Sequence, residues 1–331
     1  MNKLINLQLF AGAPNTNTTT QTGTGQEMSP QMKTFYDKVI IKNAVPNLVH
    51  DQFGQKKPIP KNSGKTIEFR RLNPFAKTTT ALTEGVTPDG KKLDWATVTA
   101  TVSQYGDYVT TSDILNMTAI DNNITEAGRI LGDQAGLSLD GIVREILNAG
   151  TNVQYGDGTK TSRSALTADD VLSVNAVKRA VTTLKRMNAK KIDGDYVAII
   201  HPDVAYDLMN DTKWEAVATY NPKNLYAGEI GRLYGVRFVE TSEAKIFEKA
   251  GATPSGGTAG IDVYSTLFLG ADAYGTTSIE GGGLEMIVKP VGSAGSADPL
   301  NQRSTVGWKA TKTACILTQA YIVRVETGSK Y

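Results

Sequence analysis

Hydrophobic and polar positions alternate in several stretches of the chain, and this alternation predicts β-strands with one buried face. Residues 65–72 follow the pattern, and residues 95–109 follow it again after about twenty residues. Between them, Pro88, Asp89 and Gly90 form a strong turn signal. Both strands carry many polar side chains, so the sequence predicts an extended β-loop with too few apolar residues to pack against its own core.

The strongest helical pattern covers residues 122–148, where apolar residues recur at helical spacing from Ile124 to Ile146. A helix of about 25 residues is about 38 Å long. Gly128, Gly132 and Gly136 form a neighbouring stripe, although each glycine costs about 1 kcal/mol relative to alanine in a helix. We therefore expect another segment of backbone to cross the helix closely at this stripe.

The second half of the chain alternates between helical and strand patterns, which is typical of an α/β unit. Thr167 and Asp170 resemble a capping box that opens a helix through Val171 to Leu184. Further helices are predicted at 32–45, 204–209 and 229–234, and further strands at 196–200, 236–239, 263–269, 284–288 and 306–325.

The first thirty residues predict a short strand on a polar tether. Ile5, Leu7 and Leu9 alternate with Asn6 and Gln8, and residues 11–30 contain almost no apolar side chains. The apolar stretch is too short and too polar for a signal peptide. Because an extended strand can add to the sheet edge of another molecule, Leu7 and Leu9 are candidate contacts with a neighbouring copy. A frayed terminus is the alternative.

Composition removes several classes of site. The single cysteine, Cys315, excludes an internal disulfide and a zinc site built from cysteines, and the two histidines, His50 and His201, exclude a three-histidine metal centre. A net charge of +2 argues against a dedicated nucleic-acid-binding protein, and no apolar run is long enough to span a membrane. We expect no catalytic site, no cofactor and no bound metal.

The charges of the extended β-loop are opposed along its length. Residues 51–71 contain six basic and two acidic residues, whereas residues 84–107 contain four acidic and two basic residues. Such opposition could steer copies of the chain into register, although a solvated surface would look the same. The candidate inter-subunit contacts from this pattern are Lys61, Lys65, Arg70, Arg71, Glu84 and Asp89.

Two motifs suggest catalysis without completing a site. Gly64-Lys65-Thr66 matches the last three residues of a phosphate-binding loop motif. However, Ile59 stands where that motif requires its first glycine, and the segment runs into a strand rather than a helix. His201, with nearby Asp203, is the candidate base of a hydrolase, but no Gly-x-Ser-x-Gly nucleophile motif accompanies it. A hydrogen-bonded loop histidine is the simpler interpretation.

Short motifs in the same order as these elements resemble the major capsid proteins of tailed phages with the Hong Kong 97-type fold, and within them the N-four-like family. The motifs are Leu82-x-Glu84-Gly85-x-Thr87-Pro88, Tyr105-Gly106 with Thr111-x-Asp113, Asp140 late in the long helix, and Gly307-Trp308-Lys309. The resemblance implies an α+β fold and a subunit that builds an icosahedral shell around a double-stranded DNA genome.

The resemblance also implies a division of the chain into the parts of that fold. These are an N-terminal arm (1–30), an N-terminal helix region (31–50), an extended loop or E-loop (51–105), a peripheral domain with the spine helix (106–165), an axial domain (166–285) and a β-rich return to the peripheral domain (286–331).

The partners implied are other copies of the chain in pentamers and hexamers, a separate scaffolding protein, a portal, decoration proteins and packaged DNA bound without sequence specificity, with no membrane. The location implied is the virion capsid, and the host cytoplasm during assembly. A cellular compartment shell (encapsulin-like), a hydrolase, and an extracellular adhesin or surface-layer subunit remain the alternatives.

Overall fold

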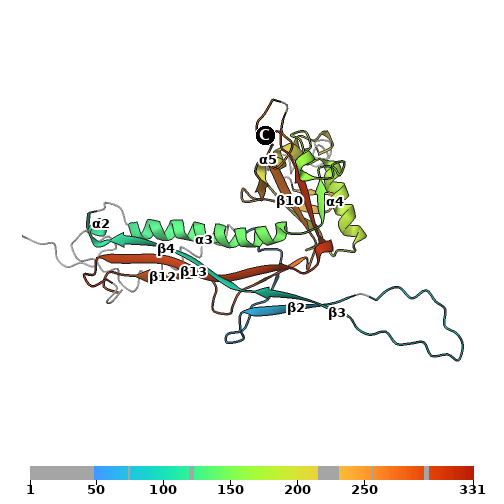
Figure 1. Ribbon diagram of the computed structural model, residues 1–331, viewed down its shortest axis with the longest axis horizontal. Helices are drawn as coiled ribbons and strands as arrows, with labels where there is room; N and C mark the ends of the chain where they lie inside the picture. The colour runs from blue at the N-terminus through green and yellow to red at the C-terminus, as the bar shows by residue number, and fades with distance from the viewer. Residues whose placement is uncertain (1–47, 74, 119–122, 215–230, 255, 294–297) are drawn as a thin grey trace, which may run out of the picture.

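The computed structural model describes residues 48–73, 75–118, 123–214, 231–254, 256–293 and 298–331. In this part of the chain a long helix lies along a long sheet, an α/β unit sits at one end of them, and a two-stranded ribbon projects with an extended loop (Figure 1). The architecture is α+β, as the sequence predicts. The predicted arm, the strand containing Leu7 and Leu9, and the helix at 32–45 lie outside the described residues.

The long sheet is built around β13 (Arg303–Ile316). β4 (Ser103–Ser112) and β12 (Glu285–Lys289) pair antiparallel with the two edges of its first part. β11 (Tyr274–Thr277) pairs with its last residues, and β1 (Gln55–Lys56) adds to β11 in parallel. β13 therefore pairs directly with β4, β11 and β12, and β1 joins the sheet through β11.

The long helix α3 (Asn123–Asn148) packs along β13, and the short helix α2 (Asp113–Thr118) follows β4 directly. The glycine stripe of α3 (Gly128, Gly132 and Gly136) is buried; that a segment of backbone crosses it closely stays a prediction. Gln134 accepts a hydrogen bond from Trp308 Nε1 at 3.3 Å. The core of this layer is formed by Leu131, Ala135, Leu139, Val306, Trp308 and Ala310.

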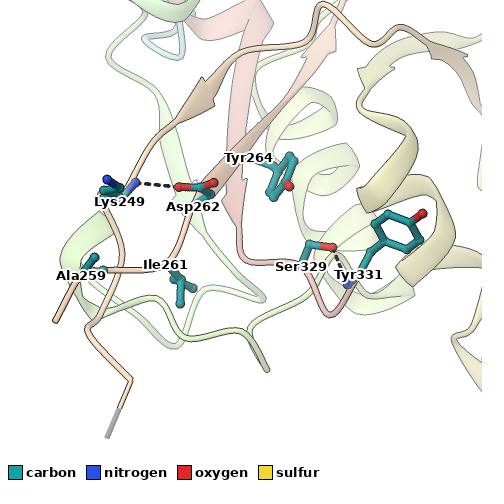
Figure 2. A pocket seen from close by; sticks show the side chains of 8 residues that line it. Lys249, Ala259, Ile261, Asp262, Tyr264, Ser329 and Tyr331 are labelled. Carbon is teal, nitrogen blue, oxygen red and sulfur yellow. Dashed lines mark hydrogen bonds between the residues drawn. The ribbon is translucent and has the colours of Figure 1, made fainter. Parts of the chain in front are cut away.

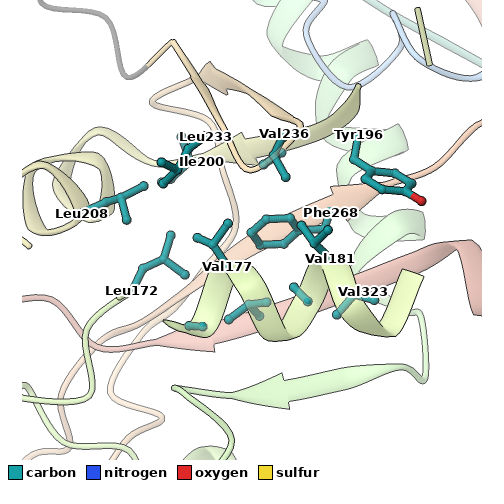
Figure 3. Packing of buried hydrophobic residues seen from close by; sticks show 14 of the residues in the cluster. Leu172, Val177, Val181, Tyr196, Ile200, Leu208, Leu233, Val236, Phe268 and Val323 are labelled. Atoms are coloured by element: carbon teal, nitrogen blue, oxygen red, sulfur yellow. The ribbon is translucent and has the colours of Figure 1, made fainter. Parts of the chain in front are cut away.

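The α/β unit contains a seven-stranded sheet with one face covered by α4 (Val174–Arg186) and α5 (Pro202–Met209). Phe268 lies at the centre of this core, between α4 and the sheet (Figure 3). The strands, in spatial order, are β5 (Val153–Tyr155), β14 (Ile322–Thr327), β10 (Val263–Leu269), β6 (Tyr196–Ile200), β8 (Val236–Glu240) and β7 (Arg232–Leu233), with β9 (Ile246–Phe247) paired to β10.

The other face of the same sheet packs against the C-terminal part of α3. Val143 and Leu147 of the helix are fully buried in one cluster with Val197, Ile199 and Leu267 of the sheet. The helix therefore contributes its first half to the core of the long sheet and its last turns to the core of the α/β unit.

The ribbon consists of β2 (Thr66–Leu72) and β3 (Trp95–Thr101), paired antiparallel over seven residues. Phe69 is buried at its base, next to Gly275, where a Cβ would lie 2.9 Å from the phenyl ring. The single strand predicted for 95–109 is thus two strands, because the buried Val102 separates β3 in the ribbon from β4 in the long sheet.

Three further predictions differ from the structure at element ends. Helix α4 begins at Val174 rather than near Thr167, because Ser173 is its N-cap and accepts the Ala176 N–H. The N–H and hydroxyl of Thr167 donate instead to Asp170 Oδ2 in a separate turn. In the described part of 229–234, β7 pairs with β8 instead of forming a helix. The pattern over 306–325 is divided between β13 and β14 by a 3-10 turn, Gln319–Tyr321. Another 3-10 turn, Arg163–Ala165, lies between β5 and α4.

A buried pair of hydrogen bonds joins the segment before the ribbon to the second half of α3. The backbone N–H of His50 donates to Asp140 Oδ1 at 2.7 Å, and its Nδ1 lies 2.5 Å from Asp140 Oδ2. Both side chains are almost completely buried, and the Tyr274 hydroxyl donates to the His50 carbonyl. Burial raises the pKa of Tyr274, so this hydroxyl keeps its proton. The contact holds the segment around His50, which precedes the ribbon in the chain, against α3.

Replacing the carboxylate tests this contact. Asp140→Ala leaves the backbone N–H and the Nδ1 of His50 without their partner, and each buried group left unsatisfied is expected to lower the free energy of unfolding by about 1–3 kcal/mol. Urea denaturation followed by circular dichroism measures this change. Asp133→Ala removes a partly exposed carboxylate from the same helix and is expected to change stability by less than about 0.5 kcal/mol; equal effects of the two substitutions would contradict the assignment.

Candidate functional site

The ribbon and the loop that joins its strands are the most exposed part of the described chain. At the end of the ribbon, Asn73 N–H donates to the Asp94 carbonyl at 3.0 Å and Asn73 Nδ2 donates to Asp94 Oδ2 at 2.6 Å. Beyond this point residues 75–94 form no strand or helix and extend away from both sheets (Figure 1). Lys91 holds the two sides of this ribbon loop together, because its ammonium group donates to Ala76 O and Thr78 Oγ1.

Large apolar side chains on the ribbon and its loop face solvent. Leu82 is 76% exposed and Leu93 is 64% exposed. A monomer seldom leaves several such side chains together in water, and an exposed apolar group of this kind marks an interaction surface. The other exposed apolar residues of this segment are Leu72, Phe75, Val86 and Trp95.

The predicted basic contacts lie on or before the ribbon, and all four are exposed. Arg70 forms an ion pair with Glu68 at 3.0 Å on the same strand. Arg71 donates to the Thr318 hydroxyl at 2.8 Å and so fastens the ribbon to its own chain. Lys61 lies against Gly281, and Lys65 immediately precedes β2.

The predicted acidic contacts, Glu84 and Asp89, are exposed on the ribbon loop. Within the described residues, no ion pair joins them to Lys61 or Lys65, so the structure does not bring the two charge groups together in one molecule. Leu7 and Leu9 lie outside the described residues. Whether these eight residues contact a neighbouring copy stays a prediction.

The contact between His50 and Asp140 is a positioning feature that the sequence patterns missed. His50 carried no motif, and Asp140 was singled out only as part of the family resemblance, with no partner assigned to it. The pairing joins positions ninety residues apart, so only the fold could reveal it.

The candidate hydrolase residues are occupied by structural hydrogen bonds. His201 Nδ1 accepts the Asp203 N–H at 3.2 Å and caps α5, and Asp203 Oδ2 accepts the Tyr264 hydroxyl at 2.8 Å. Burial, together with this carboxylate, raises the pKa of Tyr264. The histidine therefore acts as a helix cap, and within the described ranges no serine, threonine or cysteine side chain is hydrogen-bonded to it.

A cavity of about 390 Å³ lies beside this cluster, between the β10 strand and the C-terminal residues (Figure 2). The Ser329 hydroxyl accepts the Tyr331 N–H at 3.1 Å, and Asp262 accepts the Lys249 N–H at 2.7 Å. Within the lining of the cavity, the Ser329 hydroxyl thus orders the chain end and the Asp262 carboxylate orders the neighbouring turn. The residues that line it are Lys249, Ala259, Gly260, Ile261, Asp262, Tyr264, Ser329 and Tyr331.

The described part of the chain also lacks a metal-binding cluster and an activated thiol. It holds no group of three or more His, Cys, Asp or Glu side chains that could bind a metal ion. Burial raises the pKa of the Cys315 thiol, which disfavours the reactive thiolate. No helix in the described ranges is long and apolar enough to cross a membrane.

Solved structures with a similar fold include capsids of phages. The chain matches the capsid of Ralstonia phage GP4 with a TM-score of 0.65 and 15% identity, covering 100% of this chain and 99% of that one. It matches the cyanophage Pam1 capsid with a TM-score of 0.64 and 16% identity, covering 97% and 98%. A virus-like particle from Pyrococcus furiosus gives a TM-score of 0.51 at 9% identity, covering 88% and 98%.

Sequence comparison identifies the family directly. No curated protein matches the sequence. A family model described as phage capsid protein matches residues 95–323, which include the strands from β3 to β13 and the helices from α2 to α5. Members of this family are structural proteins rather than enzymes, in agreement with the occupied hydrogen bonds of His201. The chain therefore belongs to the phage capsid protein family.

Proposed function

We propose that the chain is the major capsid protein of a tailed bacteriophage and assembles with copies of itself into the icosahedral shell around a double-stranded DNA genome. The observation that carries the proposal is the exposed apolar surface of the ribbon and its loop in a chain of the capsid family. These side chains are exposed on a ribbon and loop that extend away from both sheets (Figure 1), so their favourable burial requires another copy.

The parts of the fold suggest how a subunit would be placed in the shell. Residues 51–105 would lie over an adjacent subunit as the E-loop, and residues 106–165 with 286–331 would form the peripheral domain around α3. Residues 166–285 would form the axial domain at the five-fold and six-fold axes. The single helix α3 packs against both the long sheet and the α/β unit, and this shared packing supports a rigid subunit with that division into domains.

The finer assignments belong to the same proposal. The motif around Leu82 and Pro88 and the Gly307-Trp308-Lys309 motif support membership of the N-four-like family. Assembly would take place in the host cytoplasm, with a separate scaffolding protein, a portal and decoration proteins as partners, and the packaged DNA would be bound without sequence specificity.

An encapsulin-like cellular compartment is the second candidate, and the similarity in fold to the virus-like particle from Pyrococcus furiosus favours it. The two functions differ in what the shell contains. Particles purified from the native source would hold double-stranded DNA in the first case and an enzyme in the second. Nucleic-acid staining and mass spectrometry of the contents separate them.

Polar substitution in the ribbon loop tests the interface. Leu82→Ser with Leu93→Ser is expected to leave the unfolding of the subunit unchanged, because both side chains are exposed. If each is buried in the shell, the loss of about 1.5–3 kcal/mol per side chain should raise the concentration needed for assembly at least about tenfold. Size-exclusion chromatography and negative-stain microscopy measure the assembled fraction.

The matched control retains apolar area at the same positions. Leu82→Met with Leu93→Met is expected to assemble at nearly the concentration of the unaltered protein. Unchanged assembly of the serine variant would show that the ribbon loop does not carry the interface.

Removal of the N-terminal segment tests the predicted arm. Deletion of residues 1–30 is expected to leave a subunit with the circular dichroism spectrum of the full chain but to reduce shell formation, because the deleted strand would contact a neighbour. A second variant, Leu7→Asn with Leu9→Asn, keeps the length and removes only the apolar face. Normal, stable particles from both variants would support the frayed-terminus interpretation instead.

A further inference from the structure

The outer side of α4 and the turn after it carry an uninterrupted positive charge. Residues 174–191 contain six basic side chains and no acidic one. All six are exposed, and we call them the basic face: Lys178, Arg179, Lys185, Arg186, Lys190 and Lys191. Since the whole sequence has 35 basic and 33 acidic residues, the remainder, with 29 basic and 33 acidic residues, carries a net charge of −4.

The fold holds this charge on the outside of the α/β unit. Val177, Val181 and Leu184 of α4 are buried against the sheet (Figure 3), so the helical period turns the basic residues away from the core. Lys178 lies over the Tyr234 ring at 4.5 Å and Lys191 over the Tyr196 ring at 5.9 Å. Both lysines nevertheless remain exposed to solvent.

Acidic side chains do not neutralise the basic face. Most other cations of the described chain have a carboxylate partner, such as Arg163 with Glu326 and Lys309 with Glu285. In the described ranges no ion pair includes any member of the basic face. The acids nearest in sequence beyond the turn are Asp193, which is exposed, and Asp195, which pairs with Arg232 at 3.2 Å.

Helix stability explains only part of this arrangement. Lys185 and Arg186 lie in the last turn of α4, where the helix dipole favours cations. Lys178 and Arg179 lie two turns earlier, and Lys190 and Lys191 lie beyond the helix. Unrelieved repulsion among six like charges is unfavourable to the subunit, and a bound polyanion would remove it.

We propose that the basic face binds the phosphate backbone of double-stranded DNA without sequence specificity, and this inference rests on the proposed shell function. Lys and Arg side chains without base-reading elements are suited to phosphate contacts, which give affinity but no sequence information. An acidic segment of a second copy is the less favoured partner, because residues 84–107, the acidic part of the ribbon and its loop, also carry Lys91 and Lys92 and have a net charge of only −2. The basic face would then hold the packaged genome.

Charge removal at three positions tests the inference in the unassembled full-length protein. Lys185, Arg186 and Lys190 make no side-chain hydrogen bond or ion pair within the described chain, so changing all three to Gln should preserve the fold. Fluorescence anisotropy with a labelled 30-base-pair DNA of random sequence measures the affinity at several salt concentrations. We expect the variant to bind at least about tenfold more weakly at 0.1 M salt, with the slope of log K against log salt reduced in magnitude by about 3.

A control variant removes the same charge elsewhere. Lys61→Gln, Lys65→Gln and Lys77→Gln change three exposed lysines on the ribbon side of the molecule, and are expected to alter the affinity and slope much less. Equal losses in both variants would show that DNA responds only to net charge and would overturn the inference. So would unchanged binding in the α4 variant.

Electron microscopy of the same proteins separates this inference from the proposed function. The α4 variant is expected to form shells normally, because the inference assigns its surface to DNA. Loss of shells with unchanged DNA binding would make the basic face a contact between copies and overturn the inference while the shell function stands. If the unaltered protein forms no shell under any assembly condition, the proposed function fails, whatever the DNA measurement gives.

Discussion

The packing of one helix into two cores is the interaction on which the described structure depends. The first half of α3 is buried against β13 of the long sheet, and its last turns are buried against β6 and β10 of the α/β unit. A helix of 26 residues spans about 39 Å, so it sets the distance between the two sheets. Asp140 of the same helix holds the segment around His50, which precedes the ribbon in the chain.

Elements with a clear period could be predicted from the sequence, because local pattern and tertiary burial agree there. Helix α3, strands β2, β6, β8 and β10, and the exposed β-loop all follow from alternation or helical spacing. The loop could be predicted as exposed because it lacks the apolar residues to form a core. The same argument identified Lys61, Lys65, Glu84 and Asp89 as exposed charges, but it could not say which partner they have.

The features that could not be predicted depend on contacts between distant residues. The capping-box pattern at Thr167 closes only a turn, because the Asp170 carbonyl also accepts the Gly328 N–H near the other end of the chain. Arg71 looked like a free basic contact, yet Thr318 accepts its hydrogen bond across 247 residues. His50 likewise acquires its partner only when α3 is in place. No local pattern contains such information.

The two exposed surfaces of the subunit are suited to different partners for a physical reason. Apolar side chains on the ribbon loop gain free energy only when a complementary surface excludes water, and such burial is short-ranged and requires a fitted protein surface. The charges of the basic face act over about 8–10 Å at physiological salt and require no fit. A shell needs the first kind of contact between copies, whose relative positions are fixed. Toward the genome a shell needs the second kind of contact. The strands of the genome pass each subunit in no fixed register, so only a contact without shape specificity is satisfied equally at every copy.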